Sequence, residues 1–253
     1  MKILRTGLFF LFLASTVNAD TIIIASDNWC PVSCAPGSIH EGFMVDIAKT
    51  VFGKAGHSVD YQIIPWNRTL REVRKGKIHG AIGAYTDDCP DFIFPENELA
   101  LISFKIFINK KSTWQFNDLS SLENISIGVI SDYSYGKELD RYIKKNKANS
   151  AKIQVMFGND PLKKNIKKLT SKRIDALIAT EPVFWYTVKK LNMGDHFKSA
   201  GIINPPEKAY IAFSPALLSS KTYAKILSNG VEELRKSGKL EKILNRYGLT
   251  DWK

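Results

Sequence analysis

The chain has 253 residues, with 36 lysines and arginines against 25 aspartates and glutamates, and a formal net charge of +11. A basic balance raises the question of nucleic-acid binding, but the lysines are spread over many segments rather than one stripe. We therefore interpret them as a solvated surface and expect no nucleic-acid partner. After the first nineteen residues, no segment is apolar for long enough to cross a bilayer.

Residues 1–19 are expected to be a signal peptide. Lys2 and Arg5 form a basic start, residues 7–15 are apolar but too few to span a membrane, and residues 17–19 are small enough for a cleavage site. The mature chain is then expected to begin after Ala19. A buried N-terminal helix is the alternative interpretation. Export also argues against a nucleic-acid partner.

The next part of the chain has a β-α-β-α-β pattern. Residues 21–25 predict a buried strand, residues 43–52 a helix and residues 59–64 a second strand. Asn67 is expected to cap the next helix, and residues 81–84 predict a third strand. Because strands and helices alternate, parallel pairing is expected.

A second unit of the same kind follows. Residues 101–108 predict one long strand leaving the first unit, and residues 114–122 a loop. Further strands are expected at 125–130, 153–157, 174–178 and 210–213, and helices at 135–143, after residue 160, at 181–191 and twice near the end. Asp160 is expected to cap its helix, and Pro161 suits the first helical position.

The two units predict a hinged α/β protein. Extended crossings near 106–110 and 205–211 would join a discontinuous domain 1 (20–107 plus 209–253) to domain 2 (108–208), each a mixed sheet flanked by helices. Ligand clefts favour domain interfaces and the carboxyl ends of strands. We therefore expect a cleft that captures something small.

Three cysteines follow the expected cleavage site. In an oxidising compartment, one disulfide and one free thiol are expected among Cys30, Cys34 and Cys89. A Cys34–Cys89 bond would tie two loops together and is the pairing preferred here, whereas Cys30–Cys34 would close a small local loop. No cluster with ligand spacing accompanies them, so no metal site and no cofactor is expected.

Several short motifs occur in a fixed order along the chain. They are GFMVDI at 42–47, GKIHGAIG at 76–83, DL at 118–119 before IGV at 127–129, RIDALI at 173–178 with Pro182, and GKLEKI at 238–243. Together they resemble the extracellular solute-binding proteins of family 3. The resemblance covers essentially all of the mature chain. It implies a type II periplasmic-binding-protein fold, a periplasmic location, and a monomer that delivers a small polar solute to the permease of a membrane importer.

Two positions depart from the pattern of that family. Its amino-acid binders usually carry an arginine, which clamps the ligand carboxylate, shortly after the strand that ends here near Gly83. This chain has AYTDDCP at 84–90. The family's ammonium-binding aspartate is replaced by Thr180, with Glu181 beside it. Common α-amino acids are therefore expected to bind poorly.

Candidate ligand-binding residues follow the ends of the predicted strands. They are Trp29, Trp66, Arg68, Tyr85, Thr86, Tyr133, Ser134, Thr180 and Glu181. The resemblance implies that Trp29 stacks on the ligand. Arg68 could pair a carboxylate or phosphate, or could be a solvated arginine at a helix start. The turn at 131–135 could present N–H groups to an anion, or Asp132 or Ser134 could be only a helix cap.

Three functions are compatible with this pattern. The first is a binding protein that serves a membrane importer, and the second is a dehydratase-like enzyme on the same fold. The third is a ligand sensor that docks on a membrane receptor. No Ser/His/Asp or Cys/His arrangement can be recognised, and Glu181 is the only obvious acid or base in the expected cleft. We therefore expect a binding protein rather than an enzyme.

Overall fold

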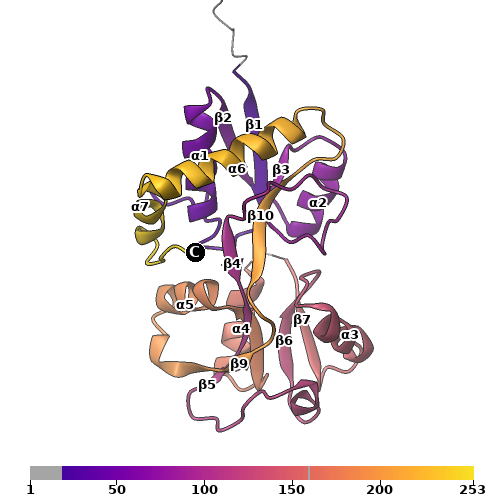
Figure 1. Ribbon diagram of the computed structural model, residues 1–253. Coiled ribbons are helices and arrows are strands. Elements are labelled where there is room, and N and C mark those ends of the chain that lie inside the picture. Colours follow the sequence, from indigo (N-terminus) through magenta and orange to yellow (C-terminus); the bar gives the residue numbers. More distant parts are fainter. Residues whose placement is uncertain (1–18, 159) are drawn as a thin grey trace, which may run out of the picture.

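The computed structural model describes residues 19–158 and 160–253. Residues 1–18 of the expected signal peptide lie outside this part of the chain. The described residues form two lobes, one above the other, joined by extended segments (Figure 1). In the described ranges, no helix combines the length and the apolar character needed to cross a membrane.

The first lobe is built on a five-stranded mixed sheet. In sheet order its strands are β2 (Ser58–Ile63), β1 (Thr21–Ser26), β3 (Gly80–Ala84), β10 (Glu207–Phe213) and β4 (Ala100–Ile102). Strand β1 is parallel to β2 and β3, whereas β10 is antiparallel to β3 and β4. Its helices are α1 (Phe43–Lys54), α2 (Trp66–Arg74), α6 (Ser220–Lys236) and α7 (Lys239–Asn245).

The second lobe repeats this arrangement. In sheet order its strands are β7 (Ile153–Met156), β6 (Ile127–Ile130), β8 (Ala176–Thr180), β5 (Phe104–Asn109) and β9 (Phe197–Ile202). Its helices are η1 (Leu119–Leu122), α3 (Lys137–Asn146), α4 (Pro161–Thr170), α5 (Glu181–Lys190) and η2 (Gly194–His196). In each sheet the first three strands of this order are parallel to one another. The fourth strand, β10 in the first lobe and β5 in the second, is antiparallel to both of its neighbours. The predicted fold class, two mixed sheets flanked by helices, is confirmed.

Helices α1 and α6 pack against each other over the first sheet. The close approach requires a glycine, because a Cβ atom on Gly230 of α6 would lie 2.2 Å from Cγ1 of Val51 on α1. The opposite face of the sheet is covered by α2, over a smaller cluster that includes Ala25, Val73 and Ala81. The central strands β1 and β3 are therefore buried on both faces, which explains why they are apolar runs, whereas the edge strand β2 is partly exposed and alternates.

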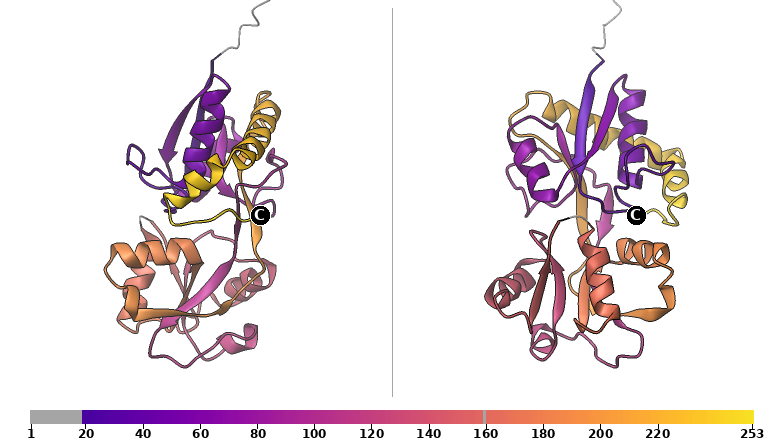
Figure 2. Two further views of the ribbon diagram at one scale, coloured as in Figure 1. Left: turned by 60° about the vertical axis from the view of Figure 1, so that its left-hand side comes forward. Right: turned by 180° about the vertical axis from the view of Figure 1, so that it is seen from behind.

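The predicted long strand over residues 101–108 is wrong in one respect, because it is broken at Ser103 into β4 and β5. The two pieces pair in different sheets, so the chain passes from one lobe to the other at this residue. The return crossing lies between β9 and β10, and the N–H of Ile203 donates to the carbonyl of Phe104 at 2.9 Å. Figure 2 shows these extended segments between the lobes from two further sides.

Of the two predicted helix caps, the one at Asn67 is wrong and the one at Asp160 is confirmed in position only. Helix α2 begins at Trp66 with Pro65 at the capping position, so Asn67 already lies inside the helix. Asp160 does occupy the capping position of α4, but its left-handed backbone, with φ of 51°, leaves the side chain without a capping hydrogen bond. The expected placement of Pro161 at the start of α4 is confirmed.

Candidate functional site

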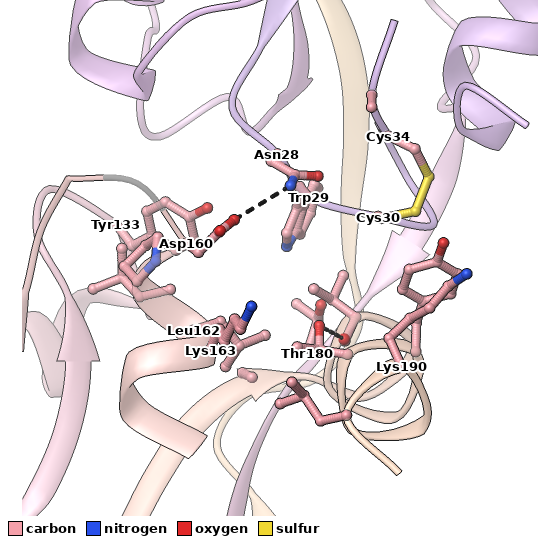
Figure 3. Close-up of a pocket in the computed structure, with 18 of the residues that line it drawn as sticks. Asn28, Trp29, Cys30, Cys34, Tyr133, Asp160, Leu162, Lys163, Thr180 and Lys190 are labelled. Atoms are coloured by element: carbon pink, nitrogen blue, oxygen red, sulfur yellow. Dashed lines mark hydrogen bonds between the residues drawn. A yellow bond between two sulfur atoms is a disulfide. The ribbon is translucent and has the colours of Figure 1, made fainter. Parts of the chain in front are cut away.

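A cleft opens between the two lobes where the strands of both sheets end. Its outer part is a cavity of about 520 Å³ lined from both lobes, by the loop after β1 on one side and by the starts of α4 and α5 on the other. In Figure 3, Trp29 extends from the upper lobe toward this space, and Leu162, Lys163 and Thr180 face it from the lower lobe. The structure therefore places the carboxyl ends of the strands around one shared space, as the sequence predicted.

A smaller cavity of about 30 Å³ shares part of its lining with the first. Its lining residues come from the ends of β1, β3 and β6 and from the crossing at β5. They are Asp27, Trp29, Trp66, Ile82, Gly83, Tyr85, Asp88, Phe104, Tyr133 and Ser134. Five of the nine predicted ligand-binding residues are in this set. We call it the inner cavity and the larger space the outer cavity.

Trp29 is held in place by a glycine at the end of β3. Gly83 has φ of +83°, and a Cβ atom there would lie 2.8 Å from Cζ3 of the Trp29 ring. Such a contact would force the ring to move, so the residue at position 83 sets the position of the indole. Trp29 is only 8% exposed and lines both cavities.

Asp27 and Tyr133 connect the lobes across the inner cavity. The Tyr133 hydroxyl donates to the carboxylate of Asp27, which follows β1 directly. Burial raises the pKa of Asp27 despite this hydrogen bond, and burial next to Asp27 raises the pKa of Tyr133 well above its ordinary value. A second link joins the Nδ2 of Asn28 to the Oδ1 of Asp160 at 3.5 Å, drawn as a dashed line in Figure 3.

Asp88 is the second carboxylate of the inner cavity. Burial raises its pKa to about 6, and the nearby Asp140, Glu207 and Asp87 act in the same direction. Neither Asp27 nor Asp88 is among the residues predicted from the sequence to bind the ligand. The rule that selected the other candidates would have found them, because both follow a predicted strand within a few residues.

Two predicted site residues carry buried hydroxyls without a partner. Neither the hydroxyl of Tyr85 nor that of Thr180 has a hydrogen-bond partner among the described residues. Tyr85 lines the inner cavity and Thr180 the outer one. Buried hydroxyls are normally hydrogen-bonded, so both are suited to bind a ligand. Thr86, the neighbour of Tyr85, is exposed and lines neither cavity.

Three further candidates differ in their positions. Trp66, the first residue of α2, lines the inner cavity. Arg68 is exposed and lines neither the inner nor the outer cavity. Glu181 forms an ion pair with Lys105 on β5, and it also lies outside both cavity linings.

The turn after β6 brings Tyr133 and Ser134 to the inner cavity. The alternative that Asp132 or Ser134 caps the following helix is wrong, because Gly136 holds the capping position of α3. The carboxylate of Asp140 accepts hydrogen bonds from the Tyr135 N–H at 2.9 Å and from the Ser134 hydroxyl at 2.8 Å. An anion supplied by the chain itself therefore already binds to this turn.

The preferred Cys34–Cys89 disulfide is wrong, and the local alternative is present. Cys30 and Cys34 are bonded, with Cα atoms 4.5 Å apart, while Cys89 is a free and buried thiol. Cys89 packs in the cluster under α2, together with Ala25 and Val73, and so lies away from the loop that holds Cys34. The bonded loop lines the outer cavity.

Across the described ranges, no three His, Cys, Asp or Glu side chains are grouped so as to hold a metal ion. No protein-family model matches this sequence. No curated protein matches it either.

Many solved structures share the arrangement. A structure from work on glutathione import by GshT and the cystine ABC importer TcyBC of Streptococcus mutans has a TM-score of 0.75 and 18% identity, covering 92% of this chain and 98% of its own. A histidine kinase sensor domain with similarity to periplasmic binding proteins has a TM-score of 0.74 and 14% identity, covering 91% and 97%. The chain has the periplasmic-binding-protein fold. An ancestral arginine-binding protein bound to glutamine also matches, with a TM-score of 0.70, 20% identity and coverage of 90% and 97%.

Proposed function

We propose that this chain is a periplasmic solute-binding protein that captures a small polar solute between its lobes and delivers it to an ABC importer. The main observation in support of this proposal is a cleft that is lined from both lobes at the carboxyl ends of the strands. Binding between hinged lobes favours the closed form, which a membrane partner can then recognise. The matching amino-acid and glutathione importer structures support the same assignment.

The contacts proposed for the ligand are the predicted residues that line the cavities. They are Trp29, Trp66, Tyr85, Tyr133, Ser134 and Thr180. No arginine lines either cavity among the described residues, which supports the expectation that common α-amino acids bind poorly. Calorimetry against the amino-acid set tests this, with Arg68→Ala as a control for the exposed arginine. Micromolar binding that survives this substitution would contradict the expectation.

The test of the proposed function begins with expression of the full sequence and N-terminal sequencing of the exported product, which should start at Asp20. A thermal-shift screen over small solutes should find one that raises the melting temperature, because a ligand that binds only the native state stabilises it. Small-angle scattering should then show a smaller radius of gyration with that solute, for a protein that remains monomeric. An unchanged radius at saturation would contradict closure.

Ligand sensing is the second candidate function, because a histidine kinase sensor domain has the same fold. The two functions differ in the membrane partner. Uptake of the bound solute into vesicles that contain an importer supports transport, whereas binding of the liganded protein to a receptor without uptake supports sensing. We also propose that binding involves no chemistry, so mass spectrometry should recover the solute unchanged after incubation.

A further inference from the structure

The inner cavity has an unusual lining for a site that binds a polar solute. Five of its ten lining residues are aromatic, namely Trp29, Trp66, Tyr85, Phe104 and Tyr133. Two are carboxylates, Asp27 and Asp88, and none is lysine, arginine or histidine. A group that enters this cavity therefore meets negative charge and aromatic rings from both lobes.

The two carboxylates lack a positive partner in the part of the chain that the structure describes. Asp27 accepts a hydrogen bond from the neutral hydroxyl of Tyr133, and neither aspartate takes part in a salt bridge. The neighbouring Asp87 differs, since it is exposed and faces Lys137 at 3.5 Å. Removing a carboxylate from water without a counter-charge is costly. A cationic ligand would relieve this cost at both residues.

The buried hydroxyl of Tyr85 is an independent sign of a ligand in the same place. Tyr85 is 8% exposed and lines the inner cavity, yet its hydroxyl has no partner among the described residues. A hydroxyl oxygen accepts hydrogen bonds, so it can pair with an N–H donor that the protein does not supply. An ammonium group is such a donor, and aromatic faces attract the same charge.

We propose that the inner cavity binds the ammonium group of an organic amine between Asp27 and Asp88, while the body of the amine extends into the outer cavity. The proposal rests on the proposed function and names the class of solute. A volume of about 30 Å³ admits only a group the size of one or two waters, which suits an ammonium head. Trp29, Phe104 and Tyr133 line both cavities and so connect them.

The outer cavity is suited to the rest of such a molecule. Its deeper lining from the second lobe is largely apolar and includes Leu162, Ile178 and Val183. The lysines of this cavity, Lys163 and Lys190, are exposed. A carboxylate attached directly beside the ammonium, as in an α-amino acid, would meet no cation in the inner cavity. The preferred ligand is therefore an amine without an adjacent carboxylate.

Calorimetry with probes that differ in charge tests the proposal on protein purified after expression of the full sequence. The amines are 2-phenylethylamine and putrescine, and the matched compounds are 2-phenylethanol, 3-phenylpropionate and phenylalanine. At least one amine is expected to bind. For 2-phenylethylamine, the neutral, anionic and zwitterionic analogues are expected to bind at least about tenfold more weakly, since a hydrogen bond to a charged group is commonly worth this factor or more.

Substitutions locate the binding amine. Asp27→Asn and Asp88→Asn keep the shape and the acceptor oxygen but remove the charge, and each is expected to weaken binding at least about tenfold. Tyr85→Phe should also weaken it, and it serves as a second variant whose fold does not depend on a cavity charge. Asp87→Asn is the matched control and should leave binding unchanged. Circular dichroism confirms the fold of each variant.

Two results would overturn the inference. One is an amine affinity that is unchanged in both Asp27→Asn and Asp88→Asn. The other is the failure of every amine to bind at millimolar concentration while a neutral or anionic solute from the thermal-shift screen does bind. In that second case the proposed function stands and only the ligand class fails. If no solute of any charge binds, both proposals fail.

Discussion

The two lobes have the same strand order but present different chemistry to the cleft. The first lobe contributes tryptophans and two carboxylates, Asp27 and Asp88, that form no salt bridge among the described residues. The second lobe contributes hydroxyls, chiefly those of Tyr133 and Thr180, and at the outer cavity the exposed lysines Lys163 and Lys190. Its Glu181 pairs with Lys105. Electrostatic attraction for a cationic group therefore resides in the first lobe.

The lobes also support their cleft faces differently. Behind the face of the second lobe, the rings of Phe107 and Phe184 stack with centroids 3.7 Å apart, and both side chains are fully buried. In the first lobe, Trp29 lies against the bare backbone of Gly83. The second-lobe face is thus supported by a stacked aromatic pair, whereas in the first lobe the packed indole of Trp29 also approaches a glycine backbone closely. The four predictions below test this difference.

The largest effect is expected for Phe184→Ala, which removes half of the stacked pair and leaves a cavity. The free energy of unfolding should fall by about 3–5 kcal/mol, measured by chemical denaturation. Phe157→Ala is the control, because that ring is 73% exposed, and it should change stability by less than about 0.5 kcal/mol. Equal effects of the two substitutions would refute the assigned role of the pair.

Gly83→Ala is expected to have the next largest effect. The added Cβ collides with the Trp29 ring, and the positive φ strains any other residue, so together they should cost about 2–4 kcal/mol. Tryptophan fluorescence should also change as the indole moves. Gly37→Ala has a similar positive φ of +74° but open space around the added atom, so it should show only the strain, about 1 kcal/mol. A larger loss at Gly37 than at Gly83 would argue against the contact.

Tyr133→Phe removes the hydroxyl that donates to Asp27 across the cleft. A lost hydrogen bond to a charged group costs about 2 kcal/mol, and the lobes should separate more in the absence of ligand. Denaturation and small-angle scattering measure the two effects. Tyr186→Phe is the control, since that partly buried tyrosine lines only the outer cavity. An unchanged radius of gyration in Tyr133→Phe would show that the hydrogen bond does not hold the lobes together.

The smallest expected effect concerns pH and Asp88. The pKa of Asp88 in the folded protein is raised to about 6, so between pH 4 and 6 the folded state binds more protons than the unfolded state. Stability therefore falls as pH rises through this window. Asp88→Asn removes this loss, so the variant should be about 1 kcal/mol more stable than the original protein at pH 7 after allowance for solvent screening. The two proteins should converge near pH 4, and a variant that is less stable at pH 7 would contradict the sign.

Much of the fold could be predicted from the sequence, because hydrophobic spacing is a local property. Buried strands such as β1 and β8 are short apolar runs, and α1 repeats apolar residues at helical spacing. Strand β9 was missed, since its sequence FKSAGI has neither a clear apolar run nor a strict alternation. Its position is decided by pairing with β5, which is a contact between distant parts of the chain.

The location of the cleft could be predicted from the sequence, but not the full set of residues that line it. Trp29, Tyr85, Tyr133 and Thr180, chosen because they follow strand ends, do line the cavities, because the carboxyl ends of the strands gather at one edge of each sheet. Which strand-end residues face the cavity depends on backbone angles and neighbouring side chains. Arg68 therefore points into solvent, although Trp66 two positions earlier lines the inner cavity.

The sequence by itself determined the order of the elements and the two-unit α/β plan, because both depend on the local spacing of apolar residues. Tertiary structure alone decided the break at Ser103, the Cys30–Cys34 pairing and the meeting of Asp27 with Tyr133. Each of these depends on a distance in space or a change of sheet. Cys89 packs in the smaller cluster under α2, whereas the carbonyl of Cys34 accepts a hydrogen bond from Tyr61 of the main cluster, and the spacing of residues along the chain does not contain that separation.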